Sequence, residues 1–255
     1  MSGSSRHTTG SITISLNNLD KLKSTLETLI QSDLDEIIVI DGKSNDGSFE
    51  YLNHLSGKDS RLRFISELDN GLYDAMNKGI QLAKSDYLIF VNAGDFLLHK
   101  KFNSFQDLYD KNPFLIFGKS ADCKNYSDFL KSKITTKPIK PIWLLKVHMI
   151  THHQSIIFKN HEKLKYDLKY TIGSDFKLIS QIYQTNKKKV LKVDNLLCVN
   201  EYAGISSNHS LGLKEHISIL QELYNYNSLQ LKTITLYLVF RIKIFKLIRG
   251  LRQTD

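Results

Sequence analysis

Hydrophobic positions follow two alternating spacings along the first hundred residues of the chain. Short runs rich in isoleucine and valine predict buried strands, and apolar residues three or four positions apart predict helices between them. This alternation is typical of a mostly parallel sheet that helices cover on both faces. The predicted strands are Ile12–Ser15, Glu36–Ile40, Leu62–Ile65 and Tyr87–Val91, and the predicted helices are Leu19–Gln31, Ser48–Leu55 and Tyr73–Lys84.

The second half of the chain has a different pattern. Its basic stretch Lys131–Pro141 contains two prolines, which predicts a linker or a loop over the site. The chain from Gly212 onward is predicted to be helical to its end. Further strands are predicted at Ser155–Phe158, Val190–Val193 and Leu196–Tyr202, and a helix at Phe176–Tyr183.

Composition narrows the class of protein. With 41% hydrophobic and 24% charged residues among 255, the chain is globular rather than disordered. Cys123 and Cys198 lack metal-ligand spacing and fit a reducing, cytoplasmic setting. Residues 1–10 are polar and lack the apolar core of a secretory signal, so we take them as disordered or expression-derived. No apolar run of about 18 residues predicts a membrane-spanning helix.

Most of the excess of basic residues behind the net charge of +9 lies near the C-terminus. Between Asn227 and Arg252 there are six basic residues and no acid. Apolar residues from Phe240 to Leu251 recur at helical spacing with the basic residues opposite, a pattern that favours an interfacial anchor on an anionic membrane. The alternative is a terminal helix packed on its own domain. Nucleic acid is a weaker candidate partner, because the basic residues do not interleave with aromatic ones.

Polar residues follow each of the first four predicted strands. In parallel sheets the ligand lies beyond the carboxyl ends of the strands, so chemistry is expected there. Neither a G-x-G-x-x-G nor a P-loop motif is present, which disfavours dinucleotide-binding and P-loop proteins. The segments after the strands are Ser15–Asn18, Asp41–Ser48, Glu67–Gly71 and Asn92–Asp95.

Three aspartates are candidates for specific roles, each with an ordinary alternative. Asp41 can accept hydrogen bonds from a nucleobase or ribose, or can serve a turn. Asp95 can hold Mg²⁺ or Mn²⁺ through one oxygen while phosphate and water fill the other positions, or can form an Asx turn. Asp175 can act as a base toward a sugar hydroxyl or cap a helix. A helix N-terminus favours the ionised form, so its pKa is expected to be low.

The adjacent histidines His152 and His153 open the strand predicted at Ser155–Phe158. Neighbouring residues in a strand face opposite sides. At most one of them, together with Gln154, is therefore expected to line the site.

Together these segments resemble family 2 glycosyltransferases, most closely the bacterial colanic-acid and O-antigen enzymes. The resemblance covers roughly residues 11–205, and Asp69–Gly79 is its most specific part. It rests on five segments in order, which are Ile12–Asn18, Val39–Ser48, Glu67–Gly79, Tyr87–Asp95 and Gly173–Asp175.

The resemblance implies a GT-A fold at residues 11–210. A nucleotide-sugar-binding half (11–118) precedes an acceptor half (119–210), and a helical basic amphipathic extension (211–255) follows. It implies Asp175 as the catalytic base, Asp95 as the metal ligand with His209 as a further candidate, and His153, Gln154 and Ser174 on the acceptor side. The implied donor-binding residues are Ser15, Asn17, Asp41, Lys43, Asp69, Asn70, Gly71, Asp74, Asn77, Asn92, Ala93 and Gly94.

Two positions depart from the family pattern. Asn92 stands where many members carry an aspartate, which removes one candidate metal carboxylate, and Ser174 stands where many carry a glutamate. The implied reaction is an inverting, metal-dependent transfer of a hexose or N-acetylhexosamine from a nucleotide-sugar, most simply a UDP-sugar. The acceptor is expected to be a saccharide, free or on a polyprenyl diphosphate, in surface polysaccharide synthesis on the cytoplasmic face of the inner membrane. The alternative is a nucleotide-sugar-binding protein of the same fold with little or no turnover.

Overall fold

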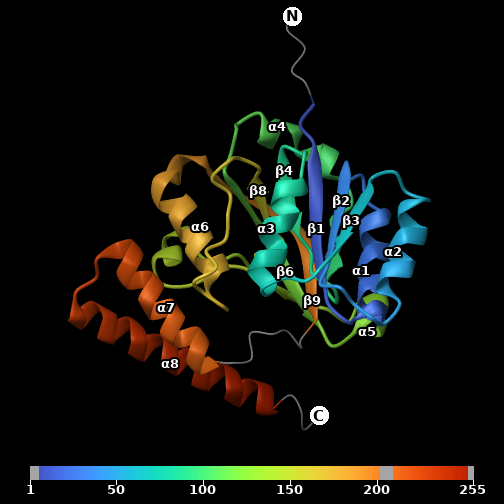
Figure 1. Ribbon diagram of the computed structural model, residues 1–255. Coiled ribbons are helices and arrows are strands. Elements are labelled where there is room, and N and C mark those ends of the chain that lie inside the picture. Colours follow the sequence, from blue (N-terminus) through green and yellow to red (C-terminus); the bar gives the residue numbers. More distant parts are fainter. Residues whose placement is uncertain (1–5, 202–208, 252–255) are drawn as a thin grey trace, which may run out of the picture.

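The computed structural model describes residues 6–201 and 209–251, in which a nine-stranded sheet lies between helices (Figure 1). The sheet order is β3-β2-β1-β4-β8-β6-β9-β5, with β7 paired to β6. The strands are β1 (Thr9–Ser15), β2 (Glu36–Asp41), β3 (Leu62–Ser66), β4 (Tyr87–Phe90), β5 (Phe96–Leu97), β6 (Leu115–Cys123), β7 (Thr135–Lys137), β8 (Ile156–Lys159) and β9 (Val190–Glu201). The α-helices are α1 (Leu19–Ile30), α2 (Ser48–Ser56), α3 (Leu72–Leu82), α4 (Gln106–Tyr109), α5 (Tyr126–Leu130), α6 (Ser174–Thr185), α7 (His209–Tyr224) and α8 (Ser228–Leu251).

The first four strands form the parallel part of the sheet, as predicted. β1 lies between β2 and β4, and β3 pairs with the outer side of β2. Alternate residues of β2 face opposite layers: Ile38 and Ile40 pack under α3, and Ile37 and Val39 pack under α1 and α2. Burial of both faces explains why these strands read as continuous apolar runs.

The second part of the sheet is mixed. β8 runs antiparallel to both β4 and β6, while β9 runs parallel to β6. Two expectations are corrected by the structure. The two strands expected between 190 and 202 are the single strand β9, and the expected loop 131–141 contains β7, paired to β6. The division between residues 118 and 119 stays a prediction, and β6 runs across that position.

The C-terminal extension is helical, as predicted, and consists of a pair of helices. α7 ends at Tyr224 and α8 begins at Ser228, with Asn225 in the left-handed region at φ 49°. The pair packs beside α6 (Figure 1). A small core joins the pair to α6 and the segment before it, formed by Tyr170, Phe176, Ile219, Leu220 and Leu231.

β1 begins at Thr9, so two of the residues expected in a disordered leader belong to the sheet, and residues 1–5 lie outside the described part. Within residues 6–201 and 209–251, none of the helices has both the length and the apolar character that crossing a membrane requires.

Candidate active site at the carboxyl edge of the sheet

Asp41 ends β2 in a fully buried position. Its carboxylate accepts hydrogen bonds from the Ser44 backbone N–H at 3.0 Å and from the hydroxyls of Ser44 and Ser66, each at 2.5 Å. A carboxylate has about four acceptor positions, so three of those of Asp41 are taken by the protein. Asp41 therefore organises the edge of the sheet and retains limited capacity for a ligand.

The loops after β1 and β2 are joined by hydrogen bonds close to Asp41. Asn17 donates its backbone N–H to the Ser44 hydroxyl at 2.8 Å and accepts the Asn45 N–H through its side-chain oxygen at 2.9 Å. Asn17 and Lys43 both adopt positive φ values, 48° and 63°, and both side chains are exposed. The Ser15 hydroxyl is buried without a partner. The exposed Lys43 ammonium is available to an anionic ligand.

Asp69 joins the same edge. A Cβ placed on Gly42 would lie 2.9 Å from Asp69 Oδ2, so residue 42 lets the carboxylate approach the β2 loop closely. Asp69 Oδ1 accepts the N–H of Gly71, which has φ 109°, and Asp74 accepts the N–H of Asn70, both at 2.9 Å. These bonds shape the turn into α3, with Asp69 half-buried and Asn70 exposed.

Asn77 faces away from this edge. Its side-chain amide donates to the Tyr166 carbonyl at 3.0 Å and accepts the Tyr166 N–H at 2.8 Å, and the residue is buried. Both polar ends of the Asn77 side chain are thus occupied in joining α3 to the Tyr166 segment. We therefore leave Asn77 out of the donor-binding residues proposed below.

Residues 92–95 form a tight turn after β4, held by α1. Gly94, at φ 100°, donates its N–H to the Thr25 hydroxyl at 2.9 Å, and that hydroxyl donates to the Asp95 carbonyl at 2.8 Å. Ala93 donates its backbone N–H to the Ile14 carbonyl at 3.2 Å. The turn presents the side chains of Asn92 and Asp95 at the sheet edge.

The Asp95 carboxylate is buried and fixed on both oxygens. Oδ2 accepts the Gln154 side-chain N–H at 2.9 Å, and Oδ1 accepts the Glu201 backbone N–H at 3.2 Å. Burial raises the pKa of Asp95 to about 7, against the opposing effect of these hydrogen bonds. Glu201 itself pairs with Lys21 at 2.6 Å.

The oxygen atoms at this turn fit a divalent cation only in part. Mg²⁺ and Mn²⁺ take oxygen ligands, and Asp95 offers a carboxylate while the Asn92 side-chain oxygen is buried without a partner. Among the described residues no group of three or more histidine, cysteine, aspartate or glutamate residues could hold a metal. The side chain of His209, a candidate ligand, lies outside the described part. These residues suit an ion whose remaining ligands come from a bound diphosphate.

Asp175 lies at the N-terminal end of α6. Its Oδ1 accepts the Phe176 N–H at 2.7 Å and the Tyr73 hydroxyl at 3.3 Å, and Tyr73 also bonds to the Ile172 carbonyl at 2.5 Å. Burial raises the pKa of Asp175 to about 6. The expectation of a low pKa was therefore wrong, because loss of water outweighs the helix N-terminus. The neighbouring Ser174 is fully buried and its hydroxyl has no partner.

His153 belongs to the core rather than to a strand opening. It lies in a 3-10 turn (His153–Ser155) and packs against Phe90 and Phe158, with Nε2 2.6 Å from the Tyr166 hydroxyl. Burial lowers the pKa of His153 to about 3, so the ring is neutral. Its burial argues against contact with an acceptor, whereas Gln154 is at the site through Asp95.

A continuous layer of side chains connects Asp175 with Asp95. Tyr73, the partner of Asp175, stacks on Tyr166 with ring centroids 5.3 Å apart. Tyr166 contacts His153, and the next residue, Gln154, bonds to Asp95. The two carboxylates are therefore linked through Tyr73, Tyr166 and the segment of residues 153–154.

Several side chains at this edge were not predicted from the sequence. Tyr73 and Tyr166 look like core aromatic residues in the sequence. Tyr73 is recognised only from its hydrogen bond to Asp175, and Tyr166 from its stacking on Tyr73. Leu16 and Leu68 are 59% and 73% exposed beside the aspartate loops, where apolar surface can stack against a nucleobase. Exposed leucines in loops carry no distinctive sequence signal.

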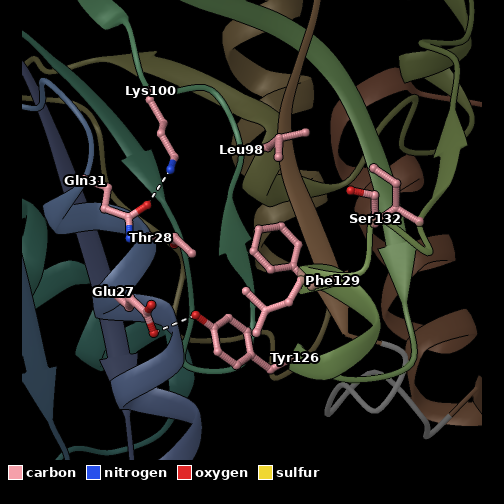
Figure 2. Close-up of a pocket in the computed structure, with 10 residues that line it drawn as sticks. Glu27, Thr28, Gln31, Leu98, Lys100, Tyr126, Phe129 and Ser132 are labelled. Carbon is pink, nitrogen blue, oxygen red and sulfur yellow. Dashed lines mark hydrogen bonds between the residues drawn. The ribbon is translucent and has the colours of Figure 1, made fainter.

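A cavity of about 240 Å³ lies apart from this edge, between α1, α5 and the segment after β5 (Figure 2). Its polar side chains pair with one another: the Tyr126 hydroxyl donates to Glu27 at 2.6 Å, and Lys100 donates to Gln31. None of the predicted site residues lines it. This cavity is therefore separate from the candidate residues at the sheet edge.

The family model for glycosyl transferase family 2 matches residues 11–167. This chain belongs to that family. The match contains Asp41, Asp69 and Asp95 but ends before Asp175, so the base candidate lies beyond the matched segment.

Similar proteins agree with this assignment. An uncharacterized glycosyltransferase of Haemophilus influenzae is 30% identical over 113 residues, covering 44% of this chain and 45% of that protein. The chain thus matches less than half the length of the curated relatives.

Solved structures share the GT-A fold. S. aureus TarS 1-349 in complex with UDP superposes with a TM-score of 0.62 at 11% identity, covering 91% of this chain and 70% of that one. Glucosyl-3-phosphoglycerate synthase from Mycobacterium tuberculosis, in complex with Mn²⁺, UDP and glucosyl-3-phosphoglycerate, gives 0.57 at 13% identity, covering 88% and 82%. At these identities the likeness establishes the fold of the chain.

Proposed function

We propose that this glycosyltransferase moves a hexose or N-acetylhexosamine from a UDP-sugar to a saccharide acceptor with inversion at the anomeric carbon. The observation that carries the proposal is the half-buried Asp175 carboxyl, which accepts the Tyr73 hydroxyl at 3.3 Å at the start of α6. A carboxyl with a pKa of about 6 is ionised at neutral pH and still basic enough to take a proton. UDP is proposed because related structures contain it.

In this reaction the acceptor hydroxyl loses its proton to Asp175 as its oxygen bonds to the anomeric carbon. The bond from that carbon to the diphosphate oxygen breaks, and attack from the opposite face inverts the centre. Asp41, Asn17 and Asp69 would orient the nucleoside, and Lys43 would pair with phosphate. Asp95 and Asn92 would hold Mg²⁺ or Mn²⁺, which supplies positive charge to the leaving diphosphate.

Turnover of UDP-sugars tests this proposal. Release of UDP from UDP-glucose, UDP-galactose and UDP-N-acetylglucosamine would be measured with Mn²⁺, with and without a mixture of saccharide acceptors. Asp175→Asn is expected to lower turnover by roughly 10²- to 10⁴-fold, the usual contribution of a general base. Glu162→Gln, an exposed acid elsewhere in the acceptor half, is the control. Wild-type turnover in Asp175→Asn would refute the assignment, and nucleotide binding with no turnover at all would favour the non-catalytic alternative.

We further propose that the acceptor is lipid-linked and that α8 rests on an anionic membrane surface. α8 packs on the protein through the buried Leu231 and Leu238, while Leu229, Leu236 and Phe240 are 60–72% exposed. The buried face agrees with a helix packed on its own domain, and the exposed apolar side chains support the membrane proposal. Exposed lysines accompany the apolar stripe at Lys232 and Lys243. The side chains of 244–251 lie outside the described part.

Vesicle sedimentation tests the membrane proposal. The double variant Leu236→Ser with Phe240→Ser is expected to lose binding to vesicles of phosphatidylglycerol and phosphatidylethanolamine, because it removes the exposed apolar stripe. Leu130→Ser removes a leucine that is 63% exposed on α5 and serves as the control. Equal sedimentation of both variants with the wild type would contradict the proposal.

A further inference from the structure

α7 contributes a carboxylate to the loop that leads to Asp175. Glu215 Oε1 accepts the backbone N–H of Thr171 at 2.8 Å. Its Oε2 accepts the N–H groups of Ile172 at 2.9 Å and Gly173 at 2.8 Å. One side chain thus binds three successive amides immediately before the α6 N-terminus.

The approach of α7 to this loop depends on a glycine. A Cβ on Gly173 would lie 2.8 Å from Ile219 Cδ1 and 3.5 Å from the Glu215 Cβ, so a larger residue would push α7 away. One turn into α6, Phe176 stacks on His216 of α7 with centroids 4.1 Å apart. The loop and α7 are therefore in close contact on both sides of Asp175.

A second carboxylate, two turns further along α7, binds residues on either side of the same segment. Glu222 accepts the Tyr170 hydroxyl at 2.8 Å and pairs with the Lys177 ammonium. Lys177, whose side chain is only 6% exposed, also pairs with Asp167 at 2.6 Å. Glu215 and Glu222 thus bind residues that bracket Asp175 in the sequence.

We propose that Glu215 is a positioning residue, which fixes the backbone of residues 171–173 and thereby sets the place of the Asp175 carboxyl. The inference rests on the proposed function, in which Asp175 is the base. The Glu215 side chain is half-buried, and each of its three hydrogen bonds accepts a backbone N–H of the loop before Asp175. Hydrogen bonds to an ionised acceptor are stronger than neutral ones, so the three together hold the backbone of this loop. The helical extension, outside the family match, is in this way part of the catalytic machinery.

Amide hydrogen exchange on the full chain tests the contact directly. In Glu215→Ala the three amides lose their acceptor, so peptides covering residues 168–176 are expected to exchange at least about 10-fold faster than in the wild type. Glu215→Gln keeps one acceptor oxygen, so its exchange rate in these peptides should lie between those of the wild type and Glu215→Ala. Lys214→Ala, an exposed neighbour on the same helix, should match the wild type. Unchanged exchange in Glu215→Ala would overturn the proposal.

UDP release from the three UDP-sugars tests the consequence. Displacement of the base slows the chemical step but leaves the donor-binding residues in place. In Glu215→Ala, kcat should therefore fall roughly 10- to 100-fold while KM for the donor stays unchanged. The acidic limb of the pH profile should move to lower pH, because Asp175 gains water. Faster exchange with wild-type kcat would overturn the positioning role.

The two proposals fail separately. If Asp175→Asn keeps wild-type turnover, or the wild type releases no UDP, the proposed function fails while the exchange measurement still decides whether Glu215 holds the loop. If Asp175→Asn loses turnover and Glu215→Ala does not, only the positioning role fails.

Discussion

Replacing Asp175 with asparagine should stabilise the protein while it removes activity. Burial raises the pKa of this carboxyl from 3.8 to about 6. At 1.36 kcal/mol per pKa unit, the folded state penalises the ionised form by about 3 kcal/mol. Asparagine keeps an oxygen that can accept the Phe176 N–H and the Tyr73 hydroxyl, and it carries no charge.

The sign of the pH dependence follows from linkage. Between the unfolded pKa near 4 and the folded pKa near 6, the folded state binds more protons, so wild-type stability falls as pH rises through this window. The gain in Asp175→Asn should therefore be under about 1 kcal/mol at pH 4 and up to about 3 kcal/mol at pH 8.

Thermal unfolding at the two pH values measures this difference. For a chain of this size each kcal/mol shifts Tm by about 2–4 °C, so Asp175→Asn should melt several degrees above the wild type at pH 8 and nearly with it at pH 4. Glu162→Gln, on the exposed surface, controls for loss of an acid. A variant that is less stable at pH 8, or equally shifted at both pH values, would refute the reasoning.

Two predictions concern the scaffold. Gly79→Ala should cost about 1–3 kcal/mol in urea unfolding, because its Cβ would lie 2.5 Å from Ile12 Cγ2. Gly57→Ala, where the nearest contact would be 3.5 Å, should be neutral or stabilising, and equal effects would contradict the packing argument. Asn77→Ala should cost about 2–4 kcal/mol by leaving the buried Tyr166 backbone groups unpaired, measured the same way. A loss below about 0.5 kcal/mol would show that water replaces the amide.

The parallel half of the fold follows from local pattern. β1 to β4 and the helices between them are visible in the sequence because each strand is buried on both faces. β6 is equally buried but was not predicted, since its apolar run is interrupted by Gly118, Lys119 and Ser120. A Cβ on Gly118 would lie 2.3 Å from Leu197 Cγ, so that glycine reflects contact with a strand far away in sequence.

The site was predictable to the extent that its residues follow strands. The sequence placed Asp41, Asp69 and Asp95 at one edge, where the structure also has them. It could not show that Asn77 and His153 serve the core, because that depends on the Tyr166 segment reaching both. The contribution of Glu215 likewise depends on α7 folding back onto α6.

We infer that the carboxyl edge of the sheet binds a nucleoside diphosphate through Asp95. Calorimetric titration of the full chain with UDP, GDP and CDP, each with and without Mn²⁺, tests it most directly. We expect UDP to bind in preference to GDP and CDP and more tightly with Mn²⁺. We expect binding to weaken at least about 10-fold in Asp95→Ala but not in Glu162→Gln. A folded protein that binds none of the three nucleotides, or binds UDP equally well without the Asp95 carboxylate, would contradict it.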